Sequence, residues 1–359
     1  MSTILIKDSL RQAVEAASGG AQTVIYTTKG QPTFMNIIEK FNLSDLDASL
    51  SGTHPAFIVN GVEKDAIYIG TYEGVVKNGE LLSLPNQSPT LGVSFESYVA
   101  AVRSNGAGHH IITNAEWAAV STKCAKSGVS PLGNNYYGRS SEDATQYGRR
   151  IDGAKATAGI TTGSPGTLTG SGPVSWRHNR KYNGISDMSG NFLEYTAGCR
   201  LFKGEIQVIS NNDAAMGNID LTSDSAAWKA IDARTGDLIT PNGSGTTPYA
   251  VKLIASGVAD YSLTVPHWSP FSGITNPSLT APVQAAALAK LKALALFPLV
   301  NDSSVYGGDV VGLVSAGDQR LLRSGMHRDS VNTGIHAAYF NLGLNPAWDR
   351  TCRPAYYIV

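Results

Sequence analysis

The pattern of apolar and polar positions at the start of the chain predicts a helix, a strand and a second helix. Ser9 is a suitable cap for a helix that runs through Ala17, and the glycine pair at 19–20 would end it. The β-branched run at 23–28 predicts a strand, and the second helix is expected over residues 34–41. No chemically suggestive group gathers here, so residues 1–50 are interpreted as an N-terminal segment for packing or attachment.

A different pattern begins near residue 51, where we place the start of the main domain, residues 51–359. Two apolar runs within 56–70 flank Asn60-Gly61, which is a strong signal for a β-hairpin. Apolar residues at helical spacing predict helices over 95–102 and 114–127. A strand at 204–210, an amphipathic helix at 284–297 and a closing strand at 355–359 complete the predicted elements. The fold class is therefore α+β.

Composition adds that much of the backbone is irregular. The chain has 38 glycines and only 16% charged residues, and its 28 basic residues balance its 28 acidic ones. This balance gives no electrostatic case for nucleic acid or a membrane surface. No apolar run reaches the roughly 20 residues of a membrane span, and the run at residues 4–6 is too short for a signal-peptide core. We expect a soluble protein, and residues 133–172, rich in Gly, Thr and Ser, as an ordered surface loop.

The segment 183–195 places turn-forming residues between apolar anchors and carries a motif. It contains Gly184-Ile185, Asp187-Met188, Gly190-Asn191 and Glu194-Tyr195. This pattern, with Ala-Glu-Trp at 115–117 and Arg323-x-Gly325, resembles the formylglycine-generating-enzyme-like branch of the C-type lectin fold. The resemblance implies small mixed sheets with two flanking helices and much irregular loop over residues 51–359.

Asp187, Asn191 and Glu194 could place three oxygen groups on one side of a compact loop. Short polar side chains in irregular segments usually satisfy backbone groups, and this is the interpretation we favour. Ca²⁺ binding is the alternative, and otherwise no cofactor or metal is predicted. The adjacent pair His109-His110 would point to opposite sides of an extended segment, which argues against a shared metal.

The C-terminal stretch carries the functional hypothesis. Aromatic side chains alternate there with short polar and charged ones, a composition typical of adaptable binding surfaces. The alternative is an ordinary loop with partly buried aromatics. The predicted ligand-binding residues are His327, Arg328, Asp329, Ser330, Asn332, His336, Tyr339, Asn341, Asn345 and Trp348.

Arg323-x-Gly325, Gly334, Pro346 and the closing Arg353 resemble the variable region of proteins diversified by retroelements, a family that includes a phage tropism determinant. The resemblance implies a diversified region at about 323–353. Adenine-directed mutagenesis in that family does not produce Lys, Glu, Gln, Met or Trp, and no Lys, Glu or Gln occurs from residue 320 onward. Met326 and Trp348 would then be fixed positions. Thr351-Cys352-Arg353 departs from the family's usual Gly-Phe-Arg ending.

These features predict a binding protein without catalytic residues. The expected partner is a protein or glycan on a target cell surface, contacted by copies displayed on a virion or cell surface. An oxidase of the formylglycine-generating type and a structural virion protein are the alternatives. The oxidase chemistry uses a C-terminal cysteine pair, whereas only Cys352 lies in that region. Cys124, Cys199 and Cys352 fit no disulfide framework or metal spacing, and one disulfide among them is left open.

Overall fold

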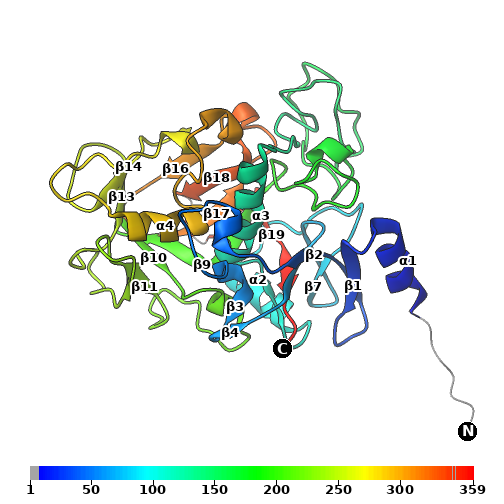
Figure 1. Cartoon of the computed structure of the whole chain (residues 1–359). Helices are drawn as coiled ribbons and strands as arrows, with labels where there is room; N and C mark the ends of the chain where they lie inside the picture. Colours follow the sequence, from blue (N-terminus) through cyan, green and yellow to red (C-terminus); the bar gives the residue numbers. More distant parts are fainter. Residues whose placement is uncertain (1–7, 342, 344) are drawn as a thin grey trace, which may run out of the picture.

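The computed structural model describes residues 8–341, 343 and 345–359. Residues 1–7, which include the apolar run considered as a signal peptide, lie outside the described residues. Within the described ranges, two main sheets, two separate two-stranded hairpins and four α-helices form a mixed α+β fold, with irregular loops around both main sheets (Figure 1). The smaller sheet has the strand order β1 (Gln22–Tyr26), β2 (Pro32–Glu39), β5 (Ala66–Gly70), β20 (Pro354–Tyr356) and β8 (His109–Ile111).

The N-terminal segment forms part of this smaller sheet. Helix α1 (Ser9–Ser18) is confirmed, with Gly19 in the left-handed conformation at its end, but its cap is Asp8 and not the predicted Ser9. The predicted helix over 34–41 is wrong, because these residues belong to β2, which pairs with both β1 and β5. Strand β2 contains β-branched residues that favour extended backbone. Residues before and after position 50 therefore share one sheet.

The Asn60-Gly61 turn is confirmed, with both residues at positive φ as a tight two-residue hairpin requires. It joins β3 (Ile58–Val59) to β4 (Val62–Glu63). The apolar run that follows does not stay in this hairpin. It leaves as β5 and pairs with β2 and β20 in the smaller sheet.

The larger sheet is built around the long strand β9 (Leu193–Phe202), which begins inside the 183–195 motif. Its neighbours β10 (Glu205–Val208) and β17 (Asp318–Ser324) are antiparallel to it. Strand β18 (Gly334–Phe340) lies between β17 and β16 (Val310–Leu313) and is buried along its whole length. The remaining strands are β11 (Lys229–Ile231), β12 (Leu238–Ile239), β13 (Lys252–Ile254), β14 (Ser262–Thr264), β15 (Ser269–Pro270) and β19 (Arg350–Cys352). A separate hairpin pairs β6 (Gly74–Lys77) with β7 (Glu80–Ser83).

The three later helices confirm the predicted ones, with shifted ends. They are α2 (Phe95–Arg103), α3 (Asn114–Ser127) and α4 (Ala285–Ala293). Helix α3 lies at the centre of the molecule (Figure 1). Its cap is Thr113, which forms a reciprocal capping box with Glu116. Trp117 is fully buried, and its indole N–H donates to the carbonyl of Ile335 in β18 at 2.8 Å.

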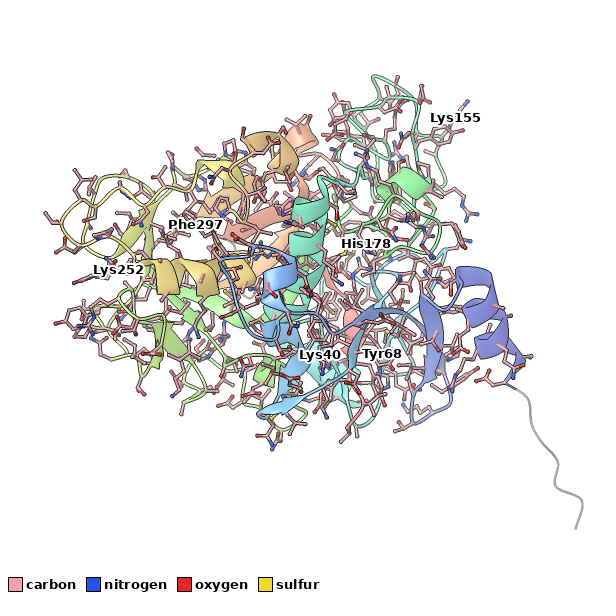
Figure 2. All side chains as sticks on the ribbon, in the orientation of Figure 1. Lys40, Tyr68, Lys155, His178, Lys252 and Phe297 are labelled. Atoms are coloured by element: carbon pink, nitrogen blue, oxygen red, sulfur yellow. The ribbon has the colours of Figure 1, made fainter. Side chains whose placement is uncertain are left out.

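Residues 133–172, all of which the structure describes, contain no helix or strand, as predicted for an ordered loop. Isolated bridges such as Asn134 with Gly190 hold the loop to the motif. Lys155 projects from its outer end (Figure 2). The three cysteines at positions 124, 199 and 352 are buried free thiols. Within the described part of the chain, no helix is both long and apolar enough to cross a membrane.

The contact between the 133–172 loop and the motif gives a first prediction. A Cβ atom added at Gly133 would lie 1.7 Å from the carbonyl oxygen of Ser189, so the backbone would have to move. Gly133→Ala should lower the free energy of unfolding by about 2 kcal/mol or more, since overpacking typically costs 1–3 kcal/mol. Urea denaturation measures this. Gly217→Ala is the matched control, because open space surrounds Gly217; equal stability of the two variants would contradict the packing described.

Candidate ligand-binding groove

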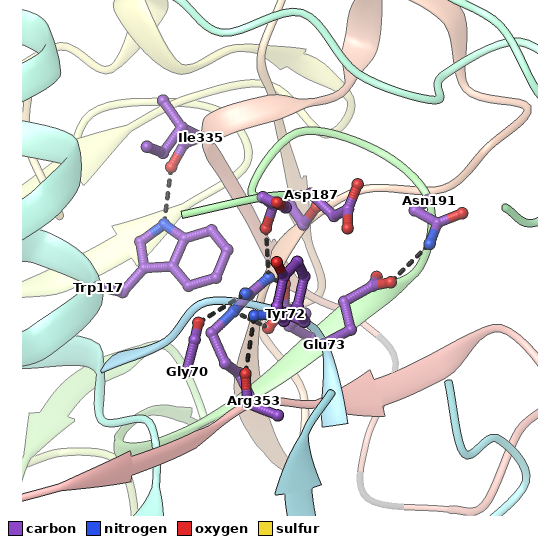
Figure 3. A network of polar contacts seen from close by, with 12 residues as sticks. Gly70, Tyr72, Glu73, Trp117, Asp187, Asn191, Ile335 and Arg353 are labelled. Carbon is purple, nitrogen blue, oxygen red and sulfur yellow. Dashed lines mark hydrogen bonds and ion pairs between the residues drawn. The ribbon is translucent and has the colours of Figure 1, made fainter. Parts of the chain in front are cut away.

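A buried arginine holds the base of the C-terminal region. Arg353 donates to the two carboxylate oxygens of Glu194, at 3.0 Å from Nε and 2.6 Å from Nη2. It also donates to the carbonyl oxygens of Gly70 and Ser186, both at 2.9 Å (Figure 3). Both side chains of the pair are fully buried. Such a pair is stable in the interior because nearly every donor of the guanidinium is matched.

Two further carboxyl groups lie beside this pair. Burial raises the pKa of Glu73 well above its usual range, and the negative charges of Asp187 and Glu194 raise it further. Burial also raises the pKa of Asp187, although the backbone N–H of Gly170 donates to its carboxylate at 2.7 Å. Asn191 donates to Glu73 at 2.5 Å (Figure 3). One arginine therefore faces three buried acids, which favours a protonated Glu73.

The three motif residues considered as oxygen ligands all act as hydrogen-bond partners. Asp187 binds the backbone of Gly170, Glu194 binds Arg353, and the side-chain oxygen of Asn191 accepts from the backbone N–H of Thr167 at 2.8 Å. The contacts of Asp187 and Asn191 confirm the interpretation that these side chains satisfy backbone groups, whereas Glu194 pairs with the side chain of Arg353. Among the described residues, no group of three or more His, Cys, Asp or Glu side chains is placed to hold a metal ion.

The first part of the C-terminal region rests on this base. Strand β17 ends at Ser324, and the chain then turns at Gly325, which has a positive φ. The backbone N–H of His327 donates to the carbonyl oxygen of Asn191 at 3.1 Å. The 133–172 loop holds the same segment from the other side, because Tyr137 N–H donates to the carbonyl oxygen of His327 at 2.6 Å. The segment is therefore clamped between the motif and the loop.

A groove of about 620 Å³ opens between these segments. Three predicted site residues line it, and they contact one another. The guanidinium of Arg328 lies 4.5 Å from the ring centre of Trp348, and the ring of His327 lies 6.1 Å from the same indole. Trp348 is 53% exposed, whereas His327 is buried and its pKa is lowered to about 4 by that burial. The other lining residues are Leu91, Tyr137, Thr161, Thr162, Gly163, Ser164, Pro165 and Phe192.

The side of the groove that faces Arg328 and Trp348 was not predicted from the sequence. Tyr137 and residues 161–165 come from the 133–172 loop, and Phe192 comes from the motif. The loop had been interpreted only as surface structure. Its aromatic and hydroxyl content was the available signal, but nothing local in the sequence places it against residue 327.

The other predicted site residues divide into surface and interior positions. Asn345 is exposed, and Ser330 and Asn332 lie half-exposed on a short 3₁₀ turn, η7 (Ser330–Asn332). Asp329 and Asn341 have a similar intermediate exposure, and burial raises the pKa of Asp329. None of these five lines the groove.

His336 and Tyr339 must be withdrawn from the contact surface. Both lie in β18, where they are 2% and 1% exposed. His336 packs against the ring of Tyr306 at 4.9 Å between centres, and burial lowers its pKa to about 3. The physical reason is that β18 is a central strand covered on both faces, so its side chains have no route to solvent.

The only C-terminal cysteine lies away from solvent. Cys352 is fully buried in β19, and burial together with the charge of Glu194 raises the pKa of its thiol well above the usual range. A thiol that stays protonated is a poor nucleophile and a poor metal ligand.

No protein-family model matches the chain, and no curated protein matches it. Among solved structures, it is similar to variable protein 1 of Treponema denticola, at 12% sequence identity and a TM-score of 0.35. The match covers 94% of this chain and 99% of that one.

The buried acids predict the direction in which the stability of the protein changes with pH. Because the pKa of Glu73 is higher in the folded state than its unfolded value near 4.5, its contribution to stability is present below pH 4.5 and is lost as the pH rises through the raised pKa. Glu73→Gln removes this loss. The stability of the variant relative to the wild type should therefore rise with pH above 4.5, by up to about 1.4 kcal/mol per pH unit.

Urea denaturation of both proteins between pH 4 and 8 measures this difference. Glu63→Gln is the control, because Glu63 is exposed on the surface and its pKa is lowered mainly by a hydrogen bond from Thr53. A stability difference for Glu73→Gln that does not change with pH would show that Glu73 ionises normally in the folded protein.

Proposed function

We propose that this is a binding protein that recognises a protein or glycan on a target cell surface through residues of about 323–353. In this proposal a retroelement diversifies that region to change the target, and several copies are displayed together on a virion or cell surface. The supporting observation is the groove, in which Arg328 and Trp348 present their side chains over a fully buried base. A rigid base beneath replaceable side chains is what a diversified binding site requires.

The C-terminal region divides into outward and inward side chains. Arg328 and Asn345 are exposed, so changes there leave the core untouched; Trp348 is also exposed but would be a fixed position. Arg323 and Arg353 are fully buried and matched by partners. Arg323, for example, donates to Asn114 of α3 at 2.8 Å and to the carbonyl oxygen of Ala295 at 2.9 Å. In the proposed diversified region, these two buried arginines would be fixed positions.

The two alternatives have less support. An oxidase of the formylglycine-generating type needs a reactive C-terminal thiol, and Cys352 is fully buried with a raised pKa. A structural virion protein would use the same exposed patch as an assembly contact. No feature of the groove favours that use over recognition of a separate target.

Sequencing the final coding segment across a population of the source tests the proposal without a known ligand. We expect substitutions at Arg328, Ser330, Asn332 and Asn345, whose side chains reach the surface. Arg323, Trp348 and the buried Cys352-Arg353 pair should be constant. Arg328 and Trp348 are both exposed, so relaxed selection alone would let both vary. Constancy of Trp348 beside variation at Arg328 would therefore indicate directed diversification. An invariant segment, or substitutions spread evenly over buried and exposed positions, would contradict diversification.

A further inference from the structure

The groove carries features that point to the chemistry of its ligand, and the argument rests on the proposed binding function. Arg328 is the single charged side chain among the described residues that line the groove. Its guanidinium is stacked on Trp348 and makes no hydrogen bond or ion pair with any described residue. Five N–H donors are therefore held on a rigid aromatic platform with their hydrogen-bonding capacity open. The guanidinium fork matches carboxylate and phosphate alike. Because no second cationic side chain is among the described residues that line the groove, a singly charged carboxylate is the better complement.

The opposite wall supplies hydroxyl groups. Thr161, Thr162 and Ser164 are exposed, and within the described part of the chain none of their hydroxyls makes a hydrogen bond. The backbone beneath them is nevertheless fixed. Arg150 donates to the carbonyl oxygen of Thr162 at 2.7 Å, and the N–H of Ser164 donates to Asp152 at 2.9 Å. These hydroxyls are thus prepositioned to donate to and accept from a polar ligand.

The groove also has an apolar floor and a volume suited to a small molecule. Phe192 and Pro165 are buried apolar lining, and the half-exposed indole of Trp348 offers an amphipathic surface. A groove of about 620 Å³ lies within the range of roughly 300–1,000 Å³ that is typical of small-molecule sites. We infer that this groove binds an acidic sugar, with its carboxylate on Arg328 and its hydroxyls on the wall formed by residues 161–164. A peptide carboxylate would use Arg328 alone and leave that wall unmatched.

The inference assigns different roles to the two walls. Residues 161–164 lie outside the region of about 323–353, so this wall would stay constant while position 328 changes. Variants of the protein would then share a preference for hydroxyl-rich ligands and differ in the charge they accept. Specificity would be set at one wall and general affinity for sugars at the other.

Saturation-transfer NMR on the full chain tests this, with N-acetylneuraminic acid, glucuronic acid, glucose and N-acetylaspartate as probes. We expect both acidic sugars to bind and glucose and N-acetylaspartate to bind at least about ten-fold more weakly. Arg328→Gln should weaken the acidic sugars by about ten-fold or more, and the double variant Thr161→Val, Thr162→Val should weaken them several-fold. Arg234→Gln is the matched control, because Arg234 also stacks on an aromatic ring, Tyr249, but lies outside the groove.

Each other outcome overturns the inference. Equal binding of glucose would remove the role of the carboxylate, and equal binding of N-acetylaspartate would indicate a protein ligand. Unchanged binding in the Thr161 and Thr162 double variant would remove the second wall. If no probe binds while the population shows diversified codons, the acidic-sugar assignment fails and the proposed function stands. An invariant coding segment would instead count against the proposed function itself.

Discussion

The structure depends on one arginine at the point where the chain passes from one sheet to the other. Residues 350–352 form β19 in the larger sheet, and residues 354–356 form β20 in the smaller one. Arg353 stands between them and binds Glu194 in β9 and the backbone of Gly70 in β5. Its side chain therefore joins both sheets from within. Breaking such a fully buried pair by removing one partner typically costs 3–5 kcal/mol, because a charge is left unmatched.

The C-terminal region is fixed by arginines near both of its ends. Arg323 is bound to α3 and to the segment after α4, and Arg353 joins the two sheets. Between these anchors β18 is buried, and the exposed positions among the described residues are Arg328, Val331, Asn345, Pro346 and Trp348. Variation at exposed positions can alter the groove without altering the anchors. Arg353 is surrounded by buried acids, and the raised pKa values of Glu73 and Asp187 make the stability of the protein sensitive to pH.

Local signals predicted what local interactions determine. The Asn60-Gly61 turn, helix α3 and the glycine end of α1 were all evident in the sequence, because each depends on residues a few positions apart. The segment 32–39 was misassigned because its apolar positions fit a helix, whereas pairing with a strand about 30 residues later made it extended. Of the residues that line the groove, the sequence analysis had named His327, Arg328 and Trp348. The sequence did not show that His336 and Tyr339 are buried, since burial of β18 depends on neighbours distant in the sequence. Residues 161–165 were not predicted to line the groove, because they lie more than 150 positions from Arg328.

The central claim is that exposed, replaceable side chains stand on a fixed base within residues 323–353. A library of single substitutions across this range, scored by resistance of the folded protein to protease, tests it most directly. Substitutions at Arg328, Ser330 and Asn332 should leave resistance near the wild-type value, while those at Arg323, Cys352 and Arg353 should abolish it. Equal sensitivity at the two sets of positions would contradict the account.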